Sequence, residues 1–206
     1  MNRITLIESI RRCEICAADL PLRPNPIIQF HSSSRILIAG QAPGRVTHEK
    51  GIPFDDASGN RLRTWIGIDR QTFYDETKVA VVPMGFCYPG TGTGGDLPPR
   101  KECAEAWRDR ILKQLNVELT LVIGQYAQSW HLGMKKKSSV TQIVKQWKSY
   151  FPELVPLPHP SPRNNIWLKK NPWFEAELLP ELQSVVAGLL SKSASKSSLK
   201  SPSKSS

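Results

Sequence analysis

The stretch ILIAGQAPG, residues 36–44, decides how this chain folds. Its first four residues are apolar, and a short apolar run that enters a glycine-bounded turn is typical of a central strand in a parallel sheet. Such a strand delivers backbone and polar groups to a pocket at its carboxyl end. We therefore expect Gly40, Gln41 and Ala42 to line a binding site.

Three other apolar runs have the character of buried strands, at residues 78–83, 119–123 and 154–157. Strands that alternate with helices predict an α/β fold, a three-layer α/β/α sandwich around a mostly parallel four-stranded sheet. Residues 84–99, rich in glycine and proline, predict a long loop of the kind that is usually functional or disordered. Helical spacing of apolar residues predicts helices over residues 2–12, 58–68, 70–75, 100–115, 125–132, 139–149 and 172–190.

The length of 206 residues suits one domain with a substantial core, which we assign to residues 1–190. Residues 191–206 are rich in serine and lysine and predict a disordered tail. No apolar run approaches the roughly 20 residues that cross a bilayer, and the first residues lack the features of a signal peptide. We expect a soluble, cytoplasmic protein that is a monomer and does not bind membranes.

The chain is basic, with a formal net charge of +10. Four lysines and no acid lie in the last sixteen residues, which leaves about +6 for the body. A positive protein neutralises phosphates and releases counterions, so this balance favours a nucleic-acid partner. Lys169, Lys170 and the run at residues 135–137 would extend the basic surface.

Two further polar segments are candidates for the same site. The sequence PFDD, residues 53–56, follows the first turn, and HPSPRN, residues 159–164, follows the last predicted strand. Carboxyl ends of parallel strands meet at one edge of a sheet, so these segments are expected to converge on one crevice.

The four cysteines form two pairs, Cys13 with Cys16 and Cys87 with Cys103. In a reducing compartment such a set indicates metal ligation more than disulfides. Thiolate ligation suits zinc or a [4Fe–4S] cluster, and the spacing does not choose between them. Four ordinary small residues without a metal are the remaining alternative.

Taken together, these motifs resemble the uracil-DNA glycosylase superfamily, especially its bacterial and archaeal branch with a [4Fe–4S] cluster. The resemblance covers about residues 10–185. It implies the α/β fold of that superfamily, DNA as the ligand, and a structural cluster that joins the amino-terminal segment to the 84–103 region. Its counterparts here are Cys13 and Cys16, the GQAPG turn at 40–44, GIPF at 51–54, CYP at 87–89 with Cys103, and HPS at 159–161.

The chain departs from that branch at two positions. Gln41 stands where the branch has a glutamate, and an amide cannot act as a general base. Pro83 stands where an asparagine reads the uracil edge, so uracil specificity is not implied. Another branch of the superfamily has a broader substrate range, and its catalytic aspartate lies in a segment that DASG at 56–59 resembles. This resemblance points to Asp56.

The resemblance gives the site residues their expected roles. Asp56, or its neighbour Asp55, would stabilise an oxocarbenium-like sugar, although either could instead cap the helix that begins near residue 58. His159 would hydrogen-bond the departing base, and Phe54 would stack on it. Ser161 would bind a flanking phosphate, and Arg163 would fill the gap left by the flipped nucleotide or clamp a phosphate.

We therefore predict a DNA glycosylase-like enzyme of base-excision repair, which hydrolyses the N-glycosidic bond of a deaminated base, uracil or a deaminated purine. Two alternatives stay open. One is a non-catalytic DNA-binding or damage-recognition protein on the same fold, favoured by Gln41 and Pro83. The other is a hydrolase of free nucleosides, in which the basic charge is incidental.

Overall fold

The centre of the molecule is a parallel sheet, formed within the described residues by four strands in the order β2-β1-β5-β6. A computed structural model describes residues 3–133 and 139–197, and for 192–197 the backbone alone. The sheet strands are β1 (Ile36–Ala39), β2 (Val79–Val81), β5 (Leu119–Ile123) and β6 (Leu154–Leu157). The helices are α1 (Arg3–Arg11), α2 (Arg45–Lys50), α3 (Ala57–Ile66), α4 (Arg70–Tyr74), α5 (Lys101–Cys103), α6 (Asp109–Leu112), α7 (Gly124–Leu132), α8 (Val140–Lys145), α9 (Asn165–Lys170) and α10 (Leu179–Ser197).

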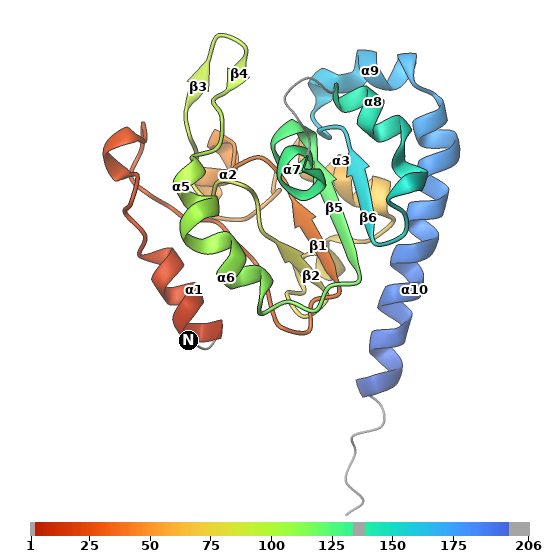
Figure 1. Ribbon diagram of the computed structural model, residues 1–206, viewed down its shortest axis with the longest axis horizontal. Coiled ribbons are helices and arrows are strands. Elements are labelled where there is room, and N and C mark those ends of the chain that lie inside the picture. Colours follow the sequence, from red (N-terminus) through yellow and green to blue (C-terminus); the bar gives the residue numbers. More distant parts are fainter. Residues whose placement is uncertain (1–2, 134–138, 198–206) are drawn as a thin grey trace, which may run out of the picture.

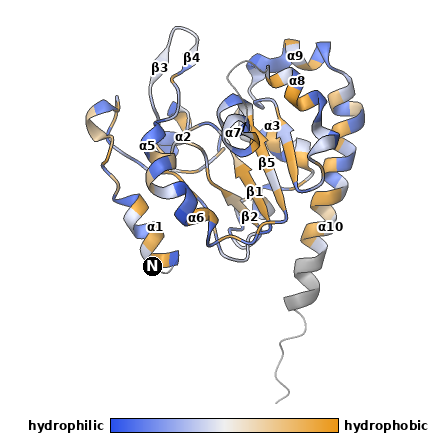
Figure 2. Ribbon diagram, viewed as in Figure 1, coloured by the Kyte–Doolittle hydropathy of each residue, from blue (hydrophilic) through white to orange (hydrophobic). Residues whose placement is uncertain are grey.

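The strands are buried on both faces because their side chains alternate between two cores. Ile36 and Ile38 pack with residues of α3, α8 and α10, whereas Leu37 packs on the other side with residues of α1 and α6. Apolar colour accordingly covers the strands and the sheet-facing side of α10 (Figure 2). The predicted three-layer α/β/α sandwich around a parallel sheet is confirmed.

Several local elements differ from the sequence expectation. The predicted loop at 84–99 contains a short antiparallel hairpin, β3 (Thr91–Gly92) and β4 (Gly95–Asp96), which projects from the body in Figure 1. Helices α2 and α9 were not expected. The long helices predicted at 100–115 and 172–190 each contain a π-helical stretch, at residues 104–108 and 174–178.

The last helix is longer than predicted. We expected it to end at residue 190, yet α10 continues to Ser197. No glycine or proline interrupts residues 189–197, so a helix already packed on the sheet can propagate through them at little cost. Residues 198–206 of the predicted tail, and the lysines at 135–137, lie outside the described residues. None of the described helices combines the length and hydropathy that a membrane span requires.

The carboxyl ends of the four strands lie at one edge of the sheet. Backbone hydrogen bonds join the segments that leave this edge: Met84 N donates to Gly40 O (2.9 Å), and Gly85 N donates to Gln41 O (2.9 Å). The turn after β1 and the loop after β2 are thereby held side by side. Any site built from these segments opens at this edge.

Candidate functional site

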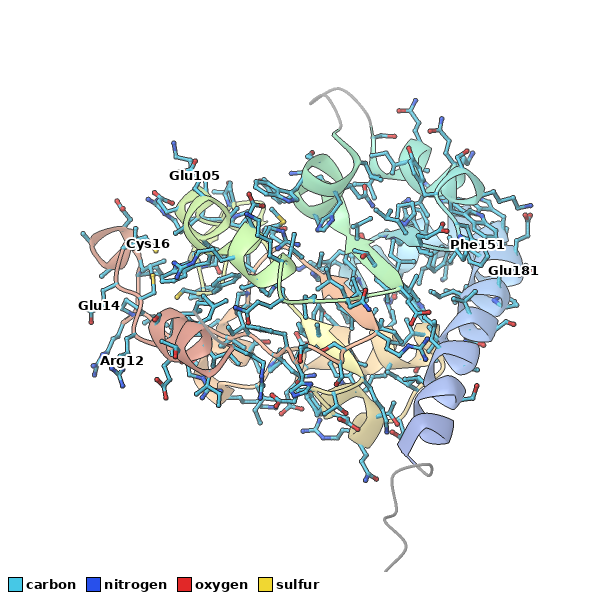
Figure 3. All side chains as sticks on the ribbon, turned by 60° about the horizontal axis from the view of Figure 1, so that its bottom comes forward. Arg12, Glu14, Cys16, Glu105, Phe151 and Glu181 are labelled. Atoms are coloured by element: carbon cyan, nitrogen blue, oxygen red, sulfur yellow. The ribbon has the colours of Figure 1, made fainter. Side chains whose placement is uncertain are left out.

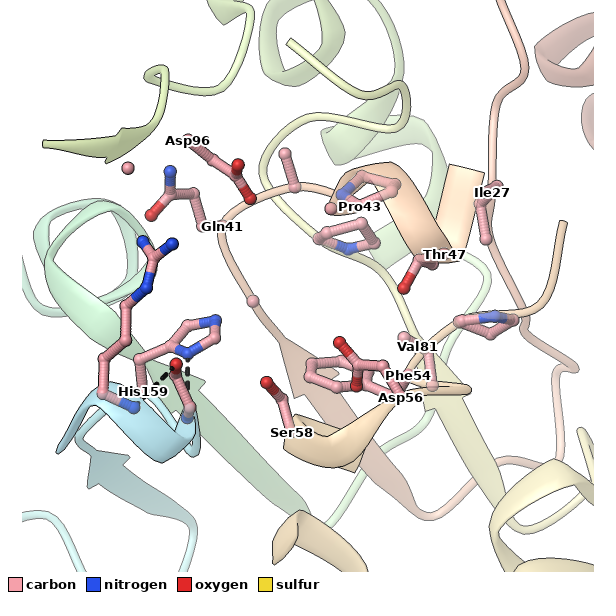
Figure 4. Close-up of a pocket in the computed structure, with 18 of the residues that line it drawn as sticks. Ile27, Gln41, Pro43, Thr47, Phe54, Asp56, Ser58, Val81, Asp96 and His159 are labelled. Carbon is pink, nitrogen blue, oxygen red and sulfur yellow. Dashed lines mark hydrogen bonds between the residues drawn. The ribbon is translucent and has the colours of Figure 1, made fainter. Parts of the chain in front are cut away.

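A pocket of about 440 Å³ opens at the carboxyl edge of the sheet (Figure 4). Most of its wall comes from four segments: the turn after β1, the 53–58 segment, the β3–β4 hairpin and the turn after β6. The lining residues are Ile27, Gly40, Gln41, Ala42, Pro43, Gly44, Thr47, Pro53, Phe54, Asp56, Ser58, Val81, Pro83, Gly94, Gly95, Asp96, His159, Ser161, Arg163 and Asn164. The two turns expected to converge, which are more than a hundred residues apart in sequence, do meet in one pocket.

Phe54 presents its ring to the pocket from a left-handed backbone conformation, with φ at 53°. This conformation is costly for a residue with a side chain, so the surroundings must hold it. Arg63 Nη1 donates to Phe54 O (3.2 Å), and a Cβ added to Gly59 would lie 1.7 Å from the same oxygen. Helix α3 therefore approaches Phe54 closely because it has a glycine there.

Asp56 caps α3 and also lines the pocket. Gly59 N donates to Asp56 Oδ1 (2.8 Å), which is the N-cap interaction that the sequence offered as an alternative to catalysis. The cap fixes the carboxylate without removing it from the wall, where Figure 4 shows it beside Phe54. A rigid negative charge results.

Asp55 does not join the other predicted site residues on the pocket wall. Its carboxylate pairs with Arg70 and with Lys50. Hydrogen bonds from these two side chains hold the pKa of the Asp55 carboxyl below its usual range. Asp55 therefore braces α2 and α4 around the site.

His159 is held in one tautomer by the turn after β6. Ser161 N donates to His159 Nδ1 (3.2 Å), so the ring proton resides on Nε2. Burial lowers the pKa of His159, and the charges of Asp56 and Asp96 oppose that shift only in part. A neutral imidazole with an Nε2–H donor follows at pH 7.

Side chains from outside the turn keep it in place. Asn164 Nδ2 donates to His159 O (2.7 Å), while Arg61 of α3 donates to Ser161 O (3.0 Å) and to Asn165 Oδ1 (2.7 Å). The last turn is thus fastened to α3, the helix that Asp56 caps. Both halves of the site are therefore attached to the same helix.

A comparison with known protein families matches residues 28–183 to the uracil DNA glycosylase superfamily, which is more than half of the chain. The chain belongs to this superfamily. Membership supports a glycosylase-type activity, hydrolysis of an N-glycosidic bond with DNA as the substrate class. The match begins after Cys16, and it does not assign the chain to the iron–sulfur branch of the superfamily.

Asp96 is a pocket residue that the sequence analysis missed. It lies on the β3–β4 hairpin, directly across from Thr91, whose Oγ1 donates to Asp96 Oδ1 (3.2 Å). Tyr88 and Thr91 share a further hydrogen bond between their hydroxyls (2.6 Å). The sequence indicated a functional glycine-rich loop at this place. It did not indicate which residues of the loop pair in a hairpin, so the direction of the Asp96 side chain could not be predicted.

Gln41 binds the hairpin through its side chain. Its Nε2 donates to Leu97 O (3.0 Å), just beyond Asp96. The side-chain amide of Gln41 therefore joins the turn after β1 to the β3–β4 hairpin. A glutamate here would place a carboxylate oxygen against the Leu97 carbonyl and could not make this bond.

A buried arginine, Arg108, binds the backbone that follows β2. This segment contains Pro83, one of the two positions at which the chain departs from the iron–sulfur branch. Arg108 donates from Nη1 to Val82 O (3.0 Å) and to Pro83 O (2.9 Å). Its Nη2 lies 2.6 Å from His131 Nε2, and burial lowers the pKa of His131 to about 4, so the ring accepts as the neutral form. The pair fixes the backbone of Pro83 at the pocket wall.

The cysteines lie together on the side of the sheet that α1 covers. Three of them, Cys16, Cys87 and Cys103, are buried, and the other three thiols lie close enough to Cys103 that their ionisation would raise its pKa further. Trp107 Nε1 donates to Cys13 Sγ (3.3 Å). Figure 3 shows Cys16 in the segment after α1, on the same side as the helix that carries Glu105. Among the described residues, no three His, Cys, Asp or Glu side chains are arranged around one metal ion.

The titration of His159 tests the electrostatics of the site. We expect its pKa below 6.5, and a further decrease in Asp56→Asn and in Asp96→Asn, because each carboxylate favours the imidazolium. His159 has a lower pKa in the folded chain than in the unfolded chain, so the unfolded chain binds its proton more tightly. This group therefore lowers the free energy of unfolding as the pH drops below about 6.5. Ring-proton NMR, assigned with His159→Gln, measures the pKa values. A value above 6.5 would contradict the neutral imidazole.

Proposed function

We propose that this chain is a DNA glycosylase of base-excision repair, which flips a deaminated base, uracil or a deaminated purine, out of DNA and hydrolyses its N-glycosidic bond. One observation carries the proposal. A single pocket holds an aromatic ring, a fixed carboxylate and a neutral imidazole, on Phe54, Asp56 and His159. The superfamily assignment adds DNA as the substrate class.

The three groups match the charges that develop during base release. The sugar becomes an oxocarbenium-like cation, and negative charge moves onto the departing base. Asp56 stabilises the cation, and the Nε2–H of His159 donates to the base. Phe54 offers a face for stacking, which offsets the few kcal/mol that unstacking from the duplex costs.

The mouth of the pocket suits the backbone of a flipped nucleotide. Ser161 lies on the wall beside His159, and Arg163 N donates to Ser161 Oγ (3.2 Å). Arg163 brings a cation to the wall, and Lys169 and Lys170 are exposed on α9 nearby in the chain. We assign Ser161 and Arg163 to flanking phosphates, contacts that position DNA without reading its sequence.

The two positions that depart from the iron–sulfur branch, Pro83 and Gln41, do not restrict the site to uracil. Pro83 contributes no side-chain donor or acceptor where a base edge would be read, and its carbonyl is already bound by Arg108. Gln41 uses its amide donor on Leu97. We therefore expect hypoxanthine and xanthine to be excised as well as uracil.

A panel of lesions tests the proposed function. Duplexes and single strands carrying uracil, hypoxanthine or xanthine are incubated with the full chain and then treated with alkali. Breaks at one or more lesions, and none in undamaged DNA, are the expected result. Binding without breaks would instead indicate a recognition protein, and base release only from free nucleosides would indicate a small-molecule hydrolase.

We also propose that the four cysteines hold a [4Fe–4S] cluster. Burial raises the pKa of Cys87 to about 11 and of Cys103 to about 12, so these thiols require a cationic group to become thiolates. Thiolate ligands suit zinc as well as a [4Fe–4S] cluster, and the resemblance of the cysteine positions to the iron–sulfur branch favours the cluster. The group would be structural and would join the segment after α1 to the region that contains Cys87 and Cys103.

Replacement of one cysteine tests this assignment. Purified protein is expected to be brown, with a broad visible absorption band and equal amounts of iron and sulfide. Cys103→Ser should lose both the band and thermal stability, because the loop between Cys87 and Cys103 then loses its attachment. The control is Ser9→Ala on α1, which leaves all four thiols in place. A colourless protein that contains zinc, or no metal, would refute the cluster.

A further inference from the structure

Two carboxylates face the pocket among the described residues, and they come from different elements. Asp56 comes from the start of α3, and Asp96 comes from the β3–β4 hairpin. The turn after β1 supplies residues 40–44, none of which has a side chain that accepts a proton from water at neutral pH. Figure 4 shows Asp96 and Asp56 on opposite sides of the pocket, with His159 at its edge.

The hairpin aims one oxygen of Asp96 at the pocket. Oδ1 accepts from Thr91, which leaves Oδ2 on the other side. Oδ2 lies 3.4 Å from the point that a Cβ on Gly44 would occupy, so it reaches across to the end of the first turn. Asp96 is exposed, so solvent water can reach its carboxylate.

One hydrogen bond joins the hairpin to the turn after β1, and a second closes the base of the hairpin. Gln41 donates to Leu97 O (3.0 Å), and Leu97 N donates to Gly90 O (2.8 Å). On the other side, Arg163 Nη1 lies 3.0 Å from the position of a Cβ on Gly95. The side chain of Gln41 thus contacts the hairpin directly beside Asp96.

The two carboxylates suit different tasks. Asp56 is fixed to α3 through the Gly59 amide, so it acts as a stationary charge. Asp96 is exposed, and among the described residues its carboxylate accepts a hydrogen bond from the Thr91 hydroxyl and not from a backbone amide that would cap a helix. We propose that Asp96 is the general base that activates the hydrolytic water, and that Gln41 is the positioning residue that places the hairpin. This assignment rests on the proposed glycosylase function.

Hydrolysis breaks one bond and forms another at C1′ of the sugar. The bond between C1′ and the base nitrogen breaks, and its electron pair leaves with the base. The water oxygen forms the new bond to C1′, and the water proton passes to Asp96 Oδ2. The departing base accepts a hydrogen bond from His159 Nε2–H and takes its proton from solvent, and Asp96 returns its proton to solvent.

Asp96→Asn tests the general base without threatening the fold, because the residue is exposed and asparagine keeps its shape. On the lesion that the native chain cleaves fastest, we expect the single-turnover rate to fall about 10²-fold. The dissociation constant for DNA should stay unchanged or decrease, since a negative charge near phosphates is removed. Glu105→Gln, which removes an exposed carboxylate from the 101–112 helix, should leave both values unchanged.

Two further readouts separate proton transfer from structure. Formate should restore part of the rate of Asp96→Ala and none of the rate of Asp56→Ala. Gln41→Leu alone should lower the single-turnover rate of excision. The double variant Gln41→Leu with Asp96→Asn should have the same rate as Asp96→Asn alone, because the two residues act as a unit.

Each outcome has a separate meaning. If the native chain cleaves a lesion and Asp96→Asn cleaves it equally fast, or only binds DNA less tightly, the role of Asp96 is wrong and the proposed function stands. If the native chain cleaves no lesion, the proposed function and the role of Asp96 fail together. If the double variant is much slower than Asp96→Asn, Gln41 does not act through the hairpin.

Discussion

Gly59→Ala is expected to lower the free energy of unfolding by about 3 kcal/mol, as overpacking of a tight contact does. The new Cβ would lie 1.7 Å from Phe54 O and 2.8 Å from Phe54 Cβ, and backbone atoms cannot yield as a flexible side-chain end can. Phe54 would have to leave its left-handed conformation, and its oxygen would lose the hydrogen bond from Arg63. Excision should fall with stability because the stacking ring moves.

Gly188→Ala is the matched control, since it makes the same change inside a helix. Nothing lies within 4 Å of a Cβ added at Gly188 in α10, so alanine should stabilise this helix by about 0.5–1 kcal/mol. Urea unfolding of both variants gives the two free energies. If Gly59→Ala proved as stable as Gly188→Ala, α3 and Phe54 would not be in the contact described.

The sheet was predictable because its strands consist almost entirely of apolar residues. Ile36–Ala39 and Leu119–Ile123 are buried on both faces, so hydrophobic patterning alone marks them. The convergence of the turns at Gly40 and His159 then follows from the parallel topology. These elements depend on local composition and on the rule that the carboxyl ends of parallel strands lie at one edge of the sheet. Both can be applied to a single sequence.

The hairpin was not predictable by the same means. Its strands have two residues each, too short to show any periodicity, and their position depends on the tertiary bond from Gln41 to Leu97. Asp96 therefore escaped notice, although it lines the pocket. Sequence patterns indicate that a glycine-rich loop is functional, but they do not show which of its side chains points inward.

The neighbours Asp55 and Asp56 show a second limit. Both are acids before a helix, and the sequence offered either as a cap or as a catalytic group. The structure separates them by their partners: Asp56 caps α3 and faces the pocket, whereas Asp55 pairs with Lys50 and Arg70. Those cations lie on α2 and α4, so only the folded arrangement decides between the two carboxylates.

Asp56→Asn is expected to slow excision about 10²- to 10³-fold, the usual cost of removing one preorganised group that stabilises charge in the transition state. Asparagine caps helices as well as aspartate does, so thermal stability should not change. Asp56→Ala would lose the cap as well and about 1 kcal/mol of stability. Single-turnover excision and thermal unfolding of both variants separate the charge from the cap.

Asp69→Asn provides the control for this substitution, because Asp69 caps α4 in the same way. Its Oδ1 accepts from Thr72 N (2.7 Å), and it does not line the pocket. This variant should excise at the native rate, which shows that a neutral cap is tolerated on a neighbouring helix. An Asp56→Asn variant as fast as Asp69→Asn would mean that Asp56 only caps α3, and Asp96 would then be the remaining carboxylate among the described pocket residues to stabilise the sugar cation.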